Sequence, residues 1–314
     1  MNFQYIRPIG TVDNYLDGAF SRAKKKASAL KSRYKRTDMS KQKIVEYSRF
    51  DVVKDVLEEK LINILKDFPS IDSLNEFYQQ LIKTTVDYVA LKKSLGAVNS
   101  AVKKIKEFHR EYFMKIKKTE HLKVIDRLRR EFYGRISSVL KRIKKELAYL
   151  EKVRQVMRTY PNVKEMPTIA IAGFPNVGKT TLLSKLSKAK AEIASYAFTT
   201  KGLNLGYMDE GSRKIQLVDT PGTLNRLETM NHIERQAYLA IKYLADLVIY
   251  VFDLSEPFPL KKQEQLFKAL KQEKKKVLVY FSKSDVLDLD EKLVKKYKGI
   301  VSIDDLKKKI RKSL

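Results

Sequence analysis

The chain has 314 residues, 43% of them hydrophobic, and carries 65 Lys and Arg against 37 Asp and Glu, for a formal net charge of +28. The absence of cysteine excludes disulfides, thiolate metal sites and cysteine nucleophiles. The first residues do not form a signal-peptide pattern, and the longest apolar stretch, residues 247–252, is too short to span a membrane. We therefore expect a cytoplasmic protein of two domains with no membrane role.

The first half of the chain shows an almost unbroken helical pattern. Apolar residues recur at spacings of three and four, as in Ile136, Leu140, Leu147 and Leu150, and Pro69 marks a turn. This pattern predicts an antiparallel helical bundle as the first domain, residues 1–160. We expect its helices near residues 12–34, 40–67, 73–92, 96–118 and 120–158.

The period changes after Tyr160 and Pro161, where short apolar runs begin to alternate with helical stretches. Such alternation is typical of a mostly parallel sheet wrapped by helices. The fold class is therefore α plus α/β, with residues 161–314 as the second domain. The expected strands are residues 169–173, 203–207, 215–219, 247–253, 277–282 and 299–302.

Residues 173–180 read Gly-Phe-Pro-Asn-Val-Gly-Lys-Thr, a complete G-x-x-x-x-G-K-S/T phosphate loop between a predicted strand and a predicted helix. The glycines let backbone N–H groups point at one phosphate. Lys179 is placed to reach the β- and γ-phosphates, and the Thr180 hydroxyl to bind Mg²⁺. The predicted nucleotide-binding residues of this segment are Gly173, Phe174, Pro175, Asn176, Val177, Gly178, Lys179, Thr180 and Thr181.

Two further segments complete the predicted phosphate and magnesium site. Asp219 and Gly222 lie in Asp-Thr-Pro-Gly at a strand end, where the carboxylate can hold Mg²⁺ and the glycine N–H can contact a γ-phosphate. Between the two motifs, Phe198-Thr199-Thr200 is a candidate switch loop, with Thr200 preferred over Thr199 as the Mg²⁺ ligand. We expect Lys179, Thr200 and Gly222 to serve catalysis, and Thr180, Thr200 and Asp219 to hold the metal.

The segment Ser282-Lys283-Ser284-Asp285 follows a predicted strand and is a candidate base pocket. Asp285 can accept from N1–H and N2–H₂ of guanine, a pair that adenine does not offer. The Lys283 stem would lie along the ring, and the backbone near Ser302 would supply a last base contact. The cofactors expected are therefore GTP or GDP together with Mg²⁺.

Two positions concern the hydrolysis step. Thr223 follows Gly222 where many small GTPases carry a water-orienting Gln, so intrinsic turnover is expected to be slow without a partner or a cation. Asn176 has two interpretations that stay open. Either it caps the local backbone, or its side chain helps to bind K⁺ at the phosphates.

These motifs resemble those of the Obg-type GTPases, and more closely the Nog branch, the nucleolar-type GTP-binding proteins. The resemblance rests on residues 173–180, 197–202 and 219–222, supported by segments such as Tyr133-Gly134-Arg135 and Asn231-His232-Ile233. It implies a helical N-terminal domain, an Obg-type G domain and a role in assembling the large ribosomal subunit, and the length is similar to that of the shorter archaeal members. The chain departs from the family pattern at three positions, Ala197, Thr223 and Ser282. At position 282 the family carries Asn.

The basic first half agrees with that role. Residues 1–166 hold 38 Lys and Arg against 20 Asp and Glu, so rRNA backbone is the expected partner. We expect a monomer. A nucleotide-sensing RNA-binding module with negligible turnover, or a GTPase acting on tRNA, stay open as alternatives. Tyr34, Tyr112 and Tyr133 are either base-stacking aromatics or aromatics of the core or its rim. The candidate contacts are Lys24, Lys25, Lys26, Lys31, Arg33, Lys35, Arg36, Lys103, Lys104, Lys106, Arg127, Arg129, Arg130, Lys141, Arg142, Lys144 and Lys145.

Overall fold

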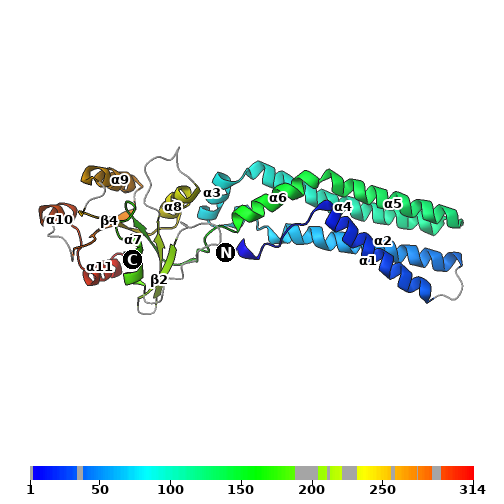
Figure 1. The fold of residues 1–314 in the computed structure, drawn as a ribbon, viewed down its shortest axis with the longest axis horizontal. Helices are drawn as coiled ribbons and strands as arrows, with labels where there is room; N and C mark the ends of the chain where they lie inside the picture. Colours follow the sequence, from blue (N-terminus) through cyan, green and yellow to red (C-terminus); the bar gives the residue numbers. More distant parts are fainter. Residues whose placement is uncertain are drawn as a thin grey trace. The chain divides into compact units, whose positions relative to one another are not determined.

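The computed structural model describes residues 3–33, 38–187, 204–210, 213–220, 232–255, 259–273, 275–284 and 291–314, with the backbone alone for residues 232–237 (Figure 1). The chain divides into two compact units. One, here called the helical unit, comprises residues 3–73 and 86–158. The other, the nucleotide unit, comprises residues 74–85 and 159–314. We describe each unit by itself.

The helical unit is a bundle of long helices that pack side by side. Helix α1 lies against α2, α2 against α4, and α4 against both α5 and α6 (Figure 1). Residues that favour helix starts open several of them: the Asp38 carboxylate accepts the N–H of Lys41 at 2.8 Å. The predicted helical bundle is confirmed. Its elements are η1 Phe3–Tyr5, α1 Val12–Ser32, α2 Met39–Asp67, η2 Ile71–Ser73, α4 Tyr88–Lys118, α5 Leu122–Arg142 and α6 Lys144–Met157.

Aromatic rings fill much of the space between these helices. Phe50 and Phe132 are fully buried, with ring centroids 4.2 Å apart. Tyr112 is 2% exposed and lies against Phe132, and Tyr133 stacks on Phe20. The structure therefore places Tyr112 in the core and the half-buried Tyr133 at its rim, because each ring already packs on another ring of the bundle.

Two expected helix boundaries were wrong. The break expected between residues 92 and 96 lies at Asp87, whose carboxylate accepts the N–H of Ala90 at 3.0 Å and starts α4. The single helix expected over residues 120–158 is interrupted at Ile143, which has φ −97° and ψ 16°. Ile143 is buried. A buried apolar residue at a break keeps the 3.6-residue periodicity going, so the pattern gave no sign of the interruption.

Helix α3, Glu76–Thr85, groups with the nucleotide unit although it precedes α4 in the chain. It packs against α8, His232–Tyr243. The buried Tyr78 hydroxyl donates to the carbonyl of Pro161 at 2.7 Å and accepts the N–H of Val163 at 2.9 Å. The two compact units therefore do not follow the expected domains 1–160 and 161–314 at every residue. Helix α3 comes from the first half of the sequence but is attached to the segment that leads into the sheet.

The strands form one sheet in the order β2-β3-β1-β4-β5, in which β2 is antiparallel to β3 and the other pairs are parallel. The predicted mostly parallel sheet is confirmed. The segment expected as a strand at residues 299–302 makes an isolated bridge between Ile300 and Tyr280. The strands are β1 Thr168–Ala172, β2 Asn204–Glu210, β3 Arg213–Asp219, β4 Leu247–Phe252 and β5 Lys276–Phe281.

Strands β1 and β4 are buried along their whole length, which explains their continuous apolar sequences. Helices α7 and α9 contribute Leu183 and Phe267 to the same core. Because β1 lies between β3 and β4, the carboxyl ends of three parallel strands meet at one edge of the sheet, where ligands bind in such folds. None of the described helices is long and apolar enough to cross a membrane. The remaining helices are α7 Lys179–Leu186, α9 Leu260–Gln272, α10 Glu291–Tyr297 and α11 Ile303–Arg311.

Candidate nucleotide site

The phosphate loop joins β1 to α7 and has the backbone that its sequence predicts. Gly178 has φ +90° and stands immediately before α7, while Gly173 has φ +151°. A Cβ atom on Gly173 would lie 2.7 Å from the carbonyl oxygen of Val251, so only glycine fits there. The loop thus turns sharply over the end of β4 and directs the N-terminus of α7 toward the site, where anions are favoured.

Lys179 is buried at the start of α7, with 7% of its surface exposed. Its Nζ donates to the carbonyl of Phe174 at 2.5 Å, a neutral partner within the loop. Burial lowers the pKa of Lys179 to about 8, although the nearby Asp219 carboxylate acts in the opposite direction. A buried ammonium whose hydrogen-bond partner is a neutral carbonyl is well placed for the negative phosphates of a nucleotide.

Thr180 and Asp219 meet as the sequence predicts for a magnesium site. The Thr180 hydroxyl donates to Oδ2 of Asp219 at 2.6 Å, and Asp219 is 4% exposed at the end of β3. Oδ1 of Asp219 is buried and accepts no hydrogen bond from the described residues. A buried, unpartnered carboxylate oxygen beside a hydroxyl suits Mg²⁺, which takes one or two carboxylates and completes its shell with water and phosphate oxygens. The residues present therefore fit the metal.

Asn204 is a site residue that sequence reasoning missed. It opens β2 opposite Asp219 in the antiparallel register, and its Nδ2 donates to Oδ2 of Asp219 at 3.2 Å. A polar residue at the first position of a predicted strand was a faint signal. Only the pairing of β2 with β3 shows that it faces the carboxylate.

Ser282 lies against the phosphate loop at the end of β5. It is 6% exposed, and both its N–H and its hydroxyl donate to the carbonyl of Phe252, at 2.9 and 3.1 Å. A Cβ on Gly178 would lie 3.6 Å from Cβ of Ser282. The structure therefore brings Ser282 beside the loop, and its polar groups bond to the end of the neighbouring strand.

Lys283 adopts the left-handed backbone conformation, with φ +58°. Its ammonium lies 2.6 Å from Oδ2 of Asp253, a carboxylate at the end of β4 with 1% of its surface exposed. Burial raises the pKa of Asp253, but the ion pair with Lys283 and the hydrogen bonds from Ser255 outweigh burial and hold that pKa below its ordinary value. Asp253 and Ser255 were not among the predicted site residues.

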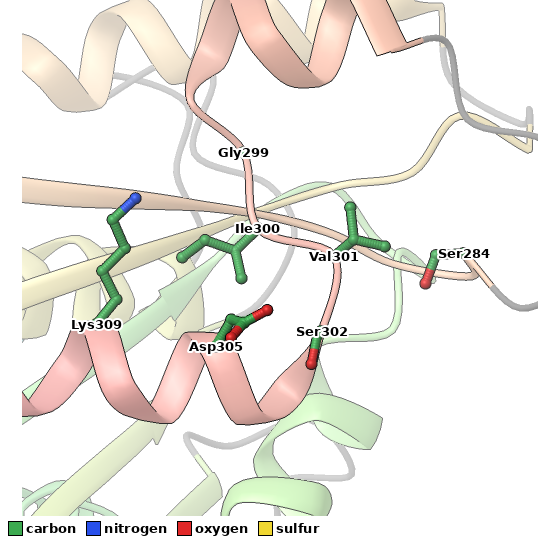
Figure 2. A pocket seen from close by; sticks show the side chains of 7 residues that line it. All are labelled: Ser284, Gly299, Ile300, Val301, Ser302, Asp305 and Lys309. Carbon is green, nitrogen blue, oxygen red and sulfur yellow. The ribbon is translucent and has the colours of Figure 1, made fainter.

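A cavity of about 630 Å³ lies beside the segment between α10 and α11. Ser302 caps α11 by accepting the N–H of Asp304 at 3.2 Å, which leaves the neighbouring backbone as the group that can contact a base. Figure 2 shows Ser284 and Ser302 on the same cavity, so the structure brings the two predicted base segments together. The cavity is lined by Ser284, Gly299, Ile300, Val301, Ser302, Asp305 and Lys309.

The remaining predicted residues of the loop are also placed. Asn176 has φ +61° and an exposed side chain that makes no hydrogen bond to any described residue. Asparagine tolerates this conformation better than most residues. Val177 and Phe174 are buried supports, whereas Thr181 is exposed in the first turn of α7. Five predicted site residues, Phe198, Thr199, Thr200, Gly222 and Asp285, lie outside the described residues, as do Thr223, Tyr34, Lys35 and Arg36.

The sequence matches known families over both units. Residues 3–164 match the family described as the NOG1 N-terminal helical domain, and residues 168–283 match the family described as 50S ribosome-binding GTPase. The chain belongs to the NOG1 family. The resemblance to the Nog branch is thereby confirmed, and the domain that carries the phosphate loop is a member of a GTPase family.

Similar proteins are known from archaea and fungi. An uncharacterized protein of Methanocaldococcus jannaschii is 36% identical over 290 residues, which cover 91% of this chain and 81% of that protein. The nucleolar GTP-binding proteins 1 of Eremothecium gossypii and Saccharomyces cerevisiae are each 37% identical. These matches cover 77% and 74% of this chain, but the chain spans only 39% and 37% of those two relatives.

Solved structures match over about half of the chain. The G domain of the FeoB iron transporter of T. maritima is 28% identical, with a TM-score of 0.40. The match covers 48% of this chain and 99% of the FeoB chain. Era in complex with MgGDPNP and nucleotides 1506–1542 of 16S ribosomal RNA is 27% identical, with a TM-score of 0.39. The match covers 47% of this chain and 56% of the Era chain. The family assignment rests on the sequence matches.

Proposed function

We propose that this chain binds and hydrolyses GTP with Mg²⁺ and acts as an assembly factor for the large ribosomal subunit. The observation that carries the proposal is the arrangement of Lys179, Thr180 and Asp219, a buried cation and a buried carboxylate whose neutral partners leave them ready for phosphate and metal. The match of residues 168–283 to a family described as 50S ribosome-binding GTPase supports the ribosomal role.

In this proposal Lys179 binds the β- and γ-phosphates, while Thr180 and Asp219 hold Mg²⁺. When bound by these residues, Mg²⁺ would supply positive charge that stabilises the transferred phosphoryl group. Thr200 adds a metal ligand, the backbone around Phe198 and Thr199 completes the switch loop, and the N–H of Gly222 contacts the γ-phosphate. Asp285 selects guanine, supported by Ser282, by the stem of Lys283 and by the backbone near Ser302.

The helical unit supplies the RNA contact. Most of the proposed cations are exposed on it, including Lys144 and Lys145. Arg129 is an exception, because its guanidinium pairs with Glu46 at 3.1 Å and Asp126 at 2.8 Å inside the unit. Exposed cations of this kind bind phosphate backbone in a salt-sensitive way with little sequence preference. We propose that the protein acts as a monomer in the cytoplasm.

Co-sedimentation with purified large subunits across a salt series tests this role. With a non-hydrolysable GTP analogue, we expect the protein in the subunit fraction at low salt and its release as salt rises. The double variant Lys144→Gln and Lys145→Gln should lower the salt slope by about one to two. The matched control, Lys308→Gln with Lys312→Gln, removes two cations from the nucleotide unit and should leave the slope unchanged. Absence from the subunit fraction at low salt would contradict the proposal.

A sensing module with negligible turnover is the second candidate, because Thr223 stands where a water-orienting Gln is common. Turnover measured with and without large subunits separates the two. Stimulation by subunits supports the assembly factor, whereas turnover that stays near zero in both favours the sensor. Stimulation by tRNA instead of subunits would favour a GTPase that acts on tRNA.

Potassium is a further part of the proposal. The exposed side chain of Asn176 stands on the phosphate loop with no hydrogen bond to a described residue, so its oxygen is available to a cation at the phosphates. We expect faster turnover in K⁺ than in Na⁺ buffer, and loss of that difference in Asn176→Ala. Equal rates in both buffers would remove K⁺ from the mechanism.

A further inference from the structure

Asp253 is a buried carboxylate between two of the segments that form the nucleotide site. Oδ1 accepts the N–H of Ser255 at 2.9 Å and its hydroxyl at 2.6 Å. Oδ2 lies 2.6 Å from Nζ of Lys283 and accepts no hydrogen bond from a backbone or hydroxyl group of the described residues. The ammonium of Lys283 is therefore the group that offsets this buried charge.

The backbone on both sides of the pair is held in place. The side chain of Gln263, which is 1% exposed, accepts the N–H of Asp253 at 3.1 Å and donates to its carbonyl at 2.7 Å. On the other side, Ser282 donates twice to the carbonyl of Phe252, which fixes the residue that precedes Lys283. The two charged side chains thus extend from two anchored strand ends.

Lys283 is engaged by more than one group. Its Nζ also donates to Oγ of Ser255 at 3.0 Å, so the ammonium is held by a carboxylate and a hydroxyl of the same strand end. The backbone of Lys283 is left-handed, so its side chain leaves the backbone in a different direction from the one it would have in a continued strand. The next residue, Ser284, lines the cavity drawn in Figure 2.

We propose that Asp253, assisted by Ser255, is a positioning residue for guanine-nucleotide binding that acts by fixing the side chain of Lys283 beside the base. A free lysine has many rotamers, and each of them must be given up when its stem packs on a ring. A carboxylate that holds the ammonium before the nucleotide arrives removes that cost from binding. The inference rests on the proposed function, because it assumes that Lys283 lies along the base.

A double-mutant cycle on the full chain tests this role. Binding of a fluorescent GDP analogue is measured for the wild type, Asp253→Asn, Lys283→Ala and the double variant. We expect Asp253→Asn to weaken binding about tenfold alone but to add nothing in the Lys283→Ala background, because it acts through the lysine. Ser255→Ala keeps both charges and should weaken binding about twofold to threefold.

Glu264→Gln is the matched control, because it removes an ion pair between Glu264 and Lys296 at 3.0 Å in the same unit and should leave binding unchanged. Unchanged binding in Asp253→Asn, or an equal loss in both lysine backgrounds, would overturn the positioning role. If Asp253→Asn does not fold, unchanged binding in Ser255→Ala overturns it. A wild type that binds no guanine nucleotide would overturn the proposed function itself, which distinguishes the two failures.

Discussion

The core of the bundle and the phosphate site treat buried charge in opposite ways. In the helical unit, Glu46 is fully buried and lies between two cations, at 3.1 Å from Arg129 and 3.2 Å from Arg49. In the nucleotide unit, Lys179 and Asp219 are also buried, but their hydrogen-bond partners are neutral. The bundle cancels its buried charge internally, whereas the site keeps a cation and a carboxylate oxygen for groups that come from outside.

This contrast predicts that removing the charge at Lys179 abolishes function while it stabilises the fold. In Lys179→Met we expect GTP turnover to fall by at least about 1,000-fold, because a preorganised cation at the phosphates is lost. A pKa lowered to about 8 means that the charged lysine costs the apo fold about 3 kcal/mol at neutral pH. Turnover assays and melting curves at pH 7 measure both effects. A variant that loses activity and also melts earlier would contradict the comparison.

The stability gain in that variant has a defined pH window. The folded-state pKa of Lys179 lies below its unfolded value, so the cost is full below pH about 8 and disappears as pH rises toward 10.5. We therefore expect the difference in free energy of unfolding between Lys179→Met and the wild type to shrink over that range. Denaturant titrations at pH 7 and pH 9.5 check the sign.

The opposite result is expected in the bundle. Glu46→Ala leaves two cations facing a buried gap, so we expect the helical unit to lose about 3 kcal/mol of stability with GTP affinity unchanged. Helical circular dichroism in a denaturant titration measures the loss. The control Glu111→Gln removes an exposed pair with Lys115 and should change stability by less than about 0.5 kcal/mol. Equal effects of the two variants would show that burial of the pair is unimportant.

Proton uptake on nucleotide binding sharpens the contrast further. Above pH 8 the buried Lys179 is mostly neutral in the apo protein, and phosphates favour its charged form. At pH 8.5 we expect GDP binding to take up about three quarters of a proton. Calorimetry in two buffers of different ionisation enthalpy measures the uptake. In Lys179→Arg the uptake should disappear, because arginine is charged throughout; uptake that persists would assign the proton to another group.

The smallest effect concerns α3, the helix that groups with the nucleotide unit. Tyr78→Phe removes the hydroxyl shared by Pro161 and Val163, at 2.7 and 2.9 Å, and leaves two buried backbone groups unpaired. We expect a loss of about 1–2 kcal/mol. Hydrogen exchange resolved by segment should show it around residues 161–163 and α3. Faster exchange confined to α4 and α5 would instead place α3 energetically with the bundle.

Much of the fold was open to prediction because its signals are local. The change from helical to alternating periodicity predicted a helical region followed by a sheet region, and buried strands such as β4 are continuous apolar runs. The helix break at Ile143 was not predictable, since a buried apolar residue there continues the pattern. The site followed the same rule: Lys179 and Thr180 were found by their motif, whereas Asn204 and Asp253 have no motif of their own.

The sequence by itself determined the phosphate loop, its strand and helix, and the family of the chain, because a loop around phosphate needs glycines, a lysine and a hydroxyl at fixed spacing. The tertiary structure decided which distant groups complete the site. Asn204 and Asp219 meet through strand register, and Tyr78 reaches Pro161 across 83 positions of the chain. Asp253 and Lys283 meet because β4 and β5 are parallel neighbours whose carboxyl ends coincide. These long-range contacts depend on strand pairing and on the geometry of the crossover connections, which the spacing of residues along the sequence does not encode.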